Sequence, residues 1–206
     1  MTTILRLGKQ QRRQAYIFAL LMTAWCFMAG TAAAQTRYYV TPTGLVPTGM
    51  DNAWTDVIKL ETALEKAEPG DEIWVQGFEE IRKNSVDYRQ VYLAPKEGWT
   101  LKAGVKLYGG FKGNETSLEQ RATLGKAYNF ACRSILSGDI SMNDTIDHVN
   151  LISSSNALRS DNAEHVLTMN LNNSVANNIN DAVSVLDGFT IVGGHASVNG
   201  GGGLVT

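Results

Sequence analysis

Five aspartates in the second half of the chain are of the residue type that acid–base catalysis and cation binding require. Paired carboxylates move protons between substrate and water, or hold a hard cation. None of the five lies in a recognisable motif, and Asp139 and Asp187 each adjoin a glycine, where turn formation alone explains an aspartate. We therefore predict structural corners, and we assign no catalytic, cofactor-binding or metal-binding residue. The five candidates are Asp139, Asp144, Asp147, Asp161 and Asp187.

The histidines and the cysteine of the mature chain add little chemistry. His148, His165 and His195 lack the short spacing of a zinc motif, so we expect solvated loop histidines. Cys132 fits a small buried apolar side chain, and a nucleophilic role would need a histidine and an asparagine or aspartate around it. The segment 144–146, Asp-Thr-Ile, resembles a bacterial periplasmic O-glycosylation acceptor, which makes Thr145 a candidate for that modification.

Exposed aromatic rings would offer platforms that stack on sugar rings, and the first half of the mature chain is rich in them. Trp54 and Trp74 flank a predicted amphipathic helix, so we expect these two to fill the space between that helix and the first strands. The aromatic candidates are Trp54, Trp74, Trp99, Tyr88 and Tyr92.

The composition is that of a globular protein. Of 206 residues, 44% are apolar and 18% are charged, and the formal charge is −2. These values exclude a highly charged disordered chain and a uniformly basic nucleic-acid binder. Two cysteines exclude a disulfide-rich scaffold. We therefore expect a folded domain with no nucleic-acid partner and no cofactor.

The first 34 residues have the order of a secretory signal peptide. They hold four basic residues and no acidic one, an apolar run over 15–29, and a cleavage site at 32–34, Ala-Ala-Ala. The run is shorter than the roughly 20 residues of a membrane-spanning helix, and a retained N-terminal anchor is the alternative. We predict a signal peptide over 1–34, export, and a mature domain of 35–206 without a transmembrane segment.

One segment of the mature chain shows the helical period. Between Thr55 and Ala67 apolar residues recur on one face, Thr55 is a suitable N-cap, and Asp56 suits the first turn. Pro69 and Gly70 follow as a stop signal. We predict a helix over 55–67 as the only substantial helix of the mature chain.

From Asp71 onward the chain consists of short β-prone runs separated by Gly, Asn and Asp. The segments 107–109, 136–138 and 186–188 share a Leu-x-Gly signature, and runs recur at the spacing of solenoid repeats. Polar inserts, 141–164 and the asparagine-rich 170–181, are expected to emerge as loops.

A β-sandwich is the alternative fold, but long alternating strands are missing and glycines gather at corners, as at 193–194 and 200–203. The fold class that we predict is an all-β solenoid of short parallel strands stacked in successive coils. Its expected inward positions are Ile73, Val75, Leu101, Val105, Leu107, Ile135, Val185 and Ile191.

These segments together resemble secreted right-handed parallel β-helix proteins of Gram-negative bacteria. The chain looks similar to the N-terminal part of proteins with the pectate-lyase-like superfold, and Gly-Gly-Leu-Val at 202–205 matches a signature of polymorphic outer-membrane protein repeats. The resemblance implies a right-handed parallel β-helix whose first coil is covered by one N-terminal capping helix. It rests on the segments 51–54, 60–67, 70–75, 100–111, 114–121, 136–140, 186–194 and 202–205.

The resemblance also implies a protein of the outer membrane surface or the extracellular space, with one of two functions. The first is a non-catalytic adhesion or carbohydrate-interacting module, whose partner would be a polysaccharide or a host or cell-surface glycan. The second is the N-terminal part of a polysaccharide lyase or glycoside hydrolase, since enzymes of this superfold use acidic side chains with calcium and a basic residue, or clustered aspartates. We favour the first for this chain.

The chain ends at Thr206, inside a β-prone run that directly follows a glycine cluster. Terminal coils need a polar cap, so we expect a piece of a longer protein that supplies the cap and the first coils. Leu204 and Val205 would then form an apolar edge through which copies of the chain self-associate.

Overall fold

The computed structural model describes residues 34–46, 52–78, 91–125, 129–144, 158–170, 183–196 and 202–205. The chain divides into residues 1–34 and residues 35–206, and the fold below concerns the second unit. The predicted signal peptide, apart from Ala34, lies outside the described residues. So do Tyr88, Thr145, Asp147 and His148, and so does most of the asparagine-rich insert.

Parallel β-sheet dominates the described residues, where the strands form three sheets and all neighbouring strands run parallel. The first sheet has the order β2 (Val57–Ile58), β1 (Arg37–Val40), β3 (Glu72–Gln76), β6 (Lys106–Phe111), β9 (Val185–Asp187). The second has the order β10 (Phe189–Val192), β7 (Ser134–Ser137), β4 (Val91–Leu93), and the third β11 (Leu204–Val205), β8 (Leu167–Asn170), β5 (Trp99–Lys102).

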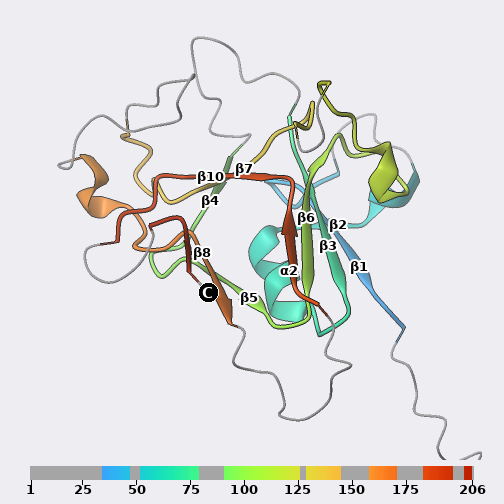
Figure 1. Cartoon of the computed structure of the whole chain (residues 1–206), viewed down its shortest axis with the longest axis horizontal. Helices are drawn as coiled ribbons and strands as arrows, with labels where there is room; N and C mark the ends of the chain where they lie inside the picture. The colour runs from blue at the N-terminus through green and yellow to red at the C-terminus, as the bar shows by residue number, and fades with distance from the viewer. Residues whose placement is uncertain are drawn as a thin grey trace, which may run out of the picture. The chain divides into compact units, whose positions relative to one another are not determined.

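From β3 onward the chain visits the three sheets in a fixed order (Figure 1). β3, β4 and β5 enter the first, second and third sheet in turn, and β6, β7 and β8 repeat this order, as do β9, β10 and β11. Each strand therefore pairs with the strand from the preceding round. The expectation of a mostly parallel β structure with one helix is confirmed.

The α-helix is shorter than the sequence predicted. α2 spans Leu60–Lys66, and it is the one α-helix of the described residues; η1 (Asn52–Thr55), η3 (Leu118–Gln120) and η4 (Leu158–Asp161) are 3-10 turns. Thr55 is not the N-cap, because the β-branched pair Val57 and Ile58 forms β2 beside β1 instead of a first helical turn. Lys59 takes the N-cap position without a side-chain hydrogen bond.

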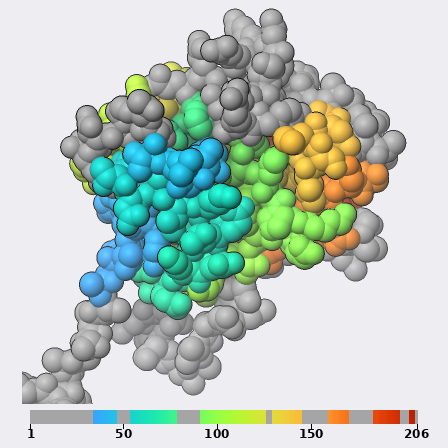
Figure 2. Space-filling view, turned by 180° about the vertical axis from the view of Figure 1, so that it is seen from behind, coloured from blue at the N-terminus to red at the C-terminus, as the bar shows by residue number. Residues whose placement is uncertain are grey.

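The helix buries one face against the sheets. Leu60, Ala63 and Leu64 are buried in the same apolar cluster as the inward residues of the strands, and α2 contacts β1, β3 and β5. On the face shown in Figure 2, the teal stretch that contains α2 adjoins the green stretch that contains β5. The predicted apolar face is therefore confirmed over 60–67, where burial of these side chains against the sheets stabilises the helix.

The core consists of side chains stacked in register across neighbouring strands. In the first sheet Ile73 and Leu107 are partners, and Leu107 is in turn the partner of Leu186. In the second sheet Tyr92, Leu136 and Ile191 form the equivalent stack. The predicted inward residues that are fully buried in this core are Ile73, Val75, Leu101, Val105 and Leu107, and Ile191 packs against it while partly buried.

Two predicted inward positions are wrong. Successive side chains of a strand point to opposite faces, and the core residues are Leu136 and Leu186. Ile135 is buried but lies on the other face of β7, and Val185 likewise lies on the other face of β9, level with Lys106. In each of these strands two consecutive residues are apolar, so the sequence does not show which of the two points into the core.

Among the described residues, no helix is both long and apolar enough to cross a membrane.

Candidate functional site

Three of the five candidate aspartates lie in one network beside the end of β7. The Asp139 carboxylate accepts hydrogen bonds from the backbone N–H groups of Asn143 (3.1 Å) and Asp144 (3.2 Å). The Asn162 side-chain amide donates to Asp144 (2.8 Å) and to the Gly193 carbonyl (2.6 Å). Asp139, Asp144 and Asn162 are buried. The network therefore ties together three chain segments that turn at this corner.

Asp161 joins the network at its exposed side. Its carboxylate accepts a hydrogen bond from the Asn143 side chain at 2.8 Å. A hydrogen bond from Ser141 is the largest of the influences that lower the pKa of Asp161. Burial raises the pKa of Asp139, and the negative charges of Asp144 and Asp161 add to this effect while the two backbone donors oppose it. Asp139 thus stabilises a turn by accepting hydrogen bonds from the backbone, as its position after Gly138 predicted.

The fourth described candidate, Asp187, lies elsewhere, on the outer face of β9. Its carboxylate forms an ion pair with Arg121 at 2.8 Å. The Arg121 guanidinium also donates to the Gly109 carbonyl (3.0 Å) and lies over the ring of Phe130, with its carbon 4.4 Å from the ring centroid. Asp187 therefore holds a cross-link between strands. Among the described residues, no group of three or more His, Cys, Asp and Glu side chains is arranged to hold a metal ion.

The three tryptophans among the described residues are buried, but two of them are not where the sequence analysis placed them. Trp54 and Trp74 belong to a second apolar cluster with Val57 and Phe111, on the opposite face of the first sheet from the core that α2 covers. The Trp74 ring stacks on Phe111 with a centroid distance of 4.4 Å. The expectation that Trp54 and Trp74 fill the space under the helix is therefore wrong. Successive side chains of β3 point to opposite faces, so Ile73 and Val75 join the main core while Trp74 joins the second cluster.

The remaining described aromatic candidates are buried as well. Trp99 belongs to the main core, and Tyr92 lies there with its hydroxyl donating to the Gln76 carbonyl at 2.9 Å. Burial raises the pKa of the Tyr92 hydroxyl well above its ordinary value. Rings buried to this degree give no surface for a sugar to stack on, so the four described candidates are not sugar platforms.

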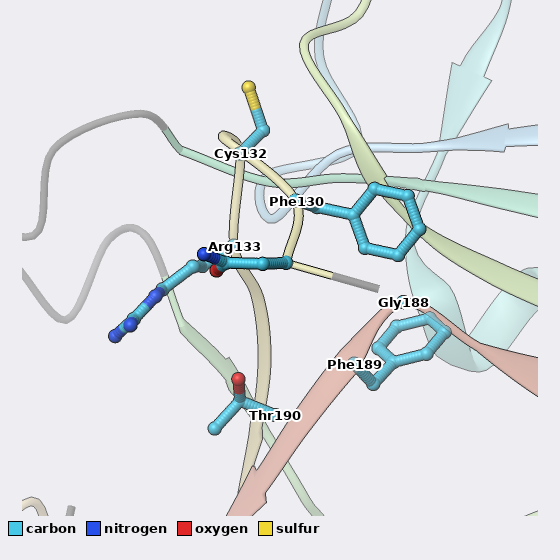
Figure 3. A pocket seen from close by; sticks show the side chains of 7 residues that line it. Phe130, Cys132, Arg133, Gly188, Phe189 and Thr190 are labelled. Carbon is cyan, nitrogen blue, oxygen red and sulfur yellow. The ribbon is translucent and has the colours of Figure 1, made fainter. Parts of the chain in front are cut away.

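A hollow of about 220 Å³ opens next to β7 and β10 (Figure 3). Figure 3 shows the Phe130 and Phe189 rings on one side of it, close to Gly188, with the Arg133 guanidinium extending away from both rings. Phe130, Phe189 and Thr190 are partly buried, whereas Asn129 and Arg133 are exposed. The lining residues are Asn129, Phe130, Cys132, Arg133, Gly188, Phe189 and Thr190.

Local structure positions this lining. Phe78 and Arg133 exchange two backbone hydrogen bonds, of 3.1 and 3.0 Å, which fix the segment that enters β7. Gly110 leaves room for the Phe130 ring, since a Cβ atom there would lie 2.8 Å from Cγ of Phe130. Register pairing of β10 with β7 then brings Phe189 level with Ser134. Segments far apart in the sequence thus meet at one surface hollow.

The lining offers binding chemistry. Two phenyl rings supply apolar faces, while the Arg133 guanidinium, the Asn129 amide and the Thr190 hydroxyl supply hydrogen-bonding groups. Arg133 has no side-chain partner among the described residues. The Cys132 thiol points away from the rings (Figure 3), and the described lining holds no histidine or carboxylate that would activate it.

The sequence did not reveal this hollow. Phe130 and Phe189 are single phenylalanines in unrelated segments, and Asn129 and Arg133 are ordinary surface residues. Only the parallel pairing of β7 with β10 brings them together. The one available signal was the Leu-x-Gly signature before Phe189, which marks the corner at Gly188.

No family model matches the chain, and no curated protein and no solved structure matches it.

Proposed function

We propose that this protein is an exported, non-catalytic β-helix module of a Gram-negative cell surface that binds a carbohydrate in the hollow beside Phe130 and Phe189. The observation that carries the proposal is the composition of that hollow, which is lined by two partly buried rings together with an exposed guanidinium, an amide and a hydroxyl. Aromatic rings stack on the apolar faces of sugars, and the polar groups bind their hydroxyl or carboxylate groups.

The repeated order of the strands supports a right-handed parallel β-helix. Three rounds of strands enter the same three sheets in the same order, and each core stack continues from one round to the next. A crossover between parallel strands of one sheet is right-handed in nearly all proteins. The α2 helix, which packs on the inward residues of β1, β3 and β5, is the capping helix in this proposal.

The chemistry of this hollow fits a binding module better than an enzyme. Polysaccharide cleavage needs a pair of groups that donate and accept protons at the scissile bond. The hollow contains rings, one guanidinium, one amide and one hydroxyl, and its described lining has no carboxylate. The carboxylates of Asp139, Asp144 and Asp187 are engaged in hydrogen bonds or an ion pair within the fold.

Binding is tested by saturation-transfer NMR with neutral oligosaccharides and with oligogalacturonides, each added to the purified chain. We expect transfer to at least one sugar, and loss of that transfer in Arg133→Ala combined with Asn129→Ala. Both side chains are exposed, and the variant loses only one surface hydrogen bond, from the Asn129 amide to the Leu124 carbonyl (3.1 Å), so it should keep its fold. Lys96→Ala is the matched control, because Lys96 is exposed and lies outside the hollow.

Transfer to no sugar, or transfer unchanged in the Arg133 and Asn129 variant, would exclude this site. Release of new reducing ends or of unsaturated products would favour the lyase or hydrolase alternative.

Export is tested separately, by mass determination of the N-terminus after expression in a Gram-negative host. The basic start, short apolar run and Ala-Ala-Ala site support cleavage after Ala34. A secreted or surface product beginning at Gln35 is the expected result. A product that still carries Met1 would contradict the signal peptide and with it the proposed location.

A further inference from the structure

A second hollow lies between α2 and β5, well separated in its lining from the hollow at Phe130. It has a volume of about 340 Å³, which is within the usual range for small-ligand sites. On the face seen in Figure 2, the segments that carry α2 and β5 adjoin. The lining residues of this α2–β5 groove are Glu61, Leu64, Glu65, Pro95, Gly98, Trp99, Thr100 and Lys102.

The groove has an apolar floor. Leu64 and Trp99 are buried members of the main core, with 7% and 4% of their surfaces exposed. The indole N–H of Trp99 is buried and has no hydrogen-bond acceptor in the structure. A buried donor without an acceptor destabilises the folded state, because the hydrogen bond that it made to water is not replaced. The groove is therefore lined by a side chain whose hydrogen-bonding capacity is unused.

The rim of the groove is acidic. Glu61 and Glu65 lie one helical turn apart on α2, both are exposed, and neither side chain has an ion-pair or hydrogen-bond partner among the described residues. Like charges at this spacing repel each other, so the pair contributes nothing to helix stability.

Lys102, the one basic residue of the lining, does not neutralise this pair. Its ammonium group donates to the Glu65 carbonyl at 2.8 Å and to the Ala67 carbonyl at 2.9 Å, and it pairs with Glu68 at 3.4 Å. Lys102 thus binds carbonyls of the last turn of α2, where a cation is favoured. The two carboxylates are left for another partner.

We infer that the α2–β5 groove binds a short basic segment of a partner protein, in which lysine or arginine alternates with apolar residues. Such a segment would bring its cationic side chains to Glu61 and Glu65 and place apolar side chains on Leu64 and Trp99. The Trp99 indole would lie beneath this segment, so its N–H signal reports whether the groove is occupied. The inference is independent of the proposed carbohydrate site, because the two linings share no residue.

The test uses the full chain and two capped peptides, one of alternating lysine and leucine and one of alternating glutamate and leucine. Binding is followed by two-dimensional ¹H–¹⁵N NMR, and Trp99→Phe identifies the Trp99 indole signal. We expect the lysine peptide to bind, to shift the Trp99 indole signal, and to bind more weakly as salt is raised. The glutamate peptide should not bind.

A matched pair of double variants tests the residues. Glu61→Gln with Glu65→Gln should weaken binding of the lysine peptide by about tenfold, because two charge contacts are lost. Asp56→Asn with Glu119→Gln removes the same charge from exposed positions outside the groove, and its affinity should stay within about twofold of the parent.

Equal binding of both peptides would overturn the proposal, because binding would then not depend on charge. An indole signal that does not move, or equal weakening by both double variants, would overturn it too. Since glutamine keeps the shape of glutamate, the variants should fold, and the comparison of peptides on the parent chain needs no variant.

Discussion

Gly109 and Gly188 approach each other so closely that neither position has room for a side chain. A Cβ atom on Gly109 would lie 2.5 Å from the Gly188 carbonyl oxygen, and one on Gly188 would lie 2.5 Å from the Gly109 carbonyl oxygen. The two glycines directly follow Tyr108 and Asp187, which are register partners in β6 and β9. The Leu-x-Gly signature at these two sites therefore marks a corner where neighbouring strands come into backbone contact.

Gly109→Ala should destabilise the fold by about 1–3 kcal/mol, because the added methyl group would collide with the Gly188 carbonyl oxygen and with the buried Ser134 side chain. Chemical denaturation of parent and variant measures this difference. Gly203→Ala is the control, since its added Cβ would be 3.4 Å from its nearest neighbour, a methyl carbon of Ile191. Equal stability of Gly109→Ala and the parent would contradict the close contact.

The signature was a partial guide to the fold. Leu107 and Leu186 are register partners in the first sheet, as a repeat predicts. Leu136, which carries the same signature, lies in the second sheet as the partner of Tyr92 and Ile191. A Leu-x-Gly run indicates a strand that is followed by a corner. Because such corners occur in more than one sheet, the signature does not tell to which sheet the strand belongs.

Features that depend only on residues near each other in the sequence could be predicted. The apolar face of the helix over 60–67 and the turn at Asp139 are of this kind. Prediction failed where long-range pairing decides the structure. The predicted helix over 55–67 included Val57 and Ile58, yet these two residues pair with β1 as a strand. For the hollow beside Phe130 and Phe189 the sequence marks only the corner at Gly188, because the lining residues meet only through the pairing of β7 with β10.

Leu107→Asp should destabilise the protein by several kcal/mol or prevent folding. Leu107 is fully buried between Ile73 and Leu186, so the change removes about 1.5–3 kcal/mol of apolar burial and adds an unpaired buried carboxylate. Thermal or urea unfolding is the measurement. Leu45→Asp should be nearly neutral, because Leu45 is 69% exposed. Comparable losses at both positions would refute the core assignment.

Arg121→Lys should cost about 3 kcal/mol, although it preserves the charge. The guanidinium donates to Leu118, Gly109 and Asp187 at once, and an ammonium group cannot reproduce that planar set of donors. Urea denaturation measures the loss. Arg133→Lys is the matched control, since Arg133 is exposed and its side chain has no partner among the described residues, and it should change stability by less than about 0.5 kcal/mol.

The last prediction concerns the pH dependence of stability at Asp139. Burial raises the folded-state pKa of this carboxyl above its ordinary value of 3.8, so the folded state binds the proton more tightly than the unfolded state. The stability that Asp139 contributes is therefore greatest below the unfolded-state pKa. It is lost as pH rises through the window between the unfolded-state and folded-state values. Above that window, the folded protein bears the cost of a buried charge next to Asp144 and Asp161.

Asp139→Asn removes the titration but keeps the size of the side chain. Loss of one carboxylate oxygen, which accepts a backbone N–H, adds a destabilising offset that does not depend on pH. We expect the free energy of unfolding of the variant, relative to the parent, to rise as pH increases upward from 3.8. Urea denaturation at a series of pH values measures this difference, with Asp56→Asn as the exposed control. A difference that is constant with pH, or one that falls with rising pH, would show that Asp139 is not a buried carboxyl of raised pKa.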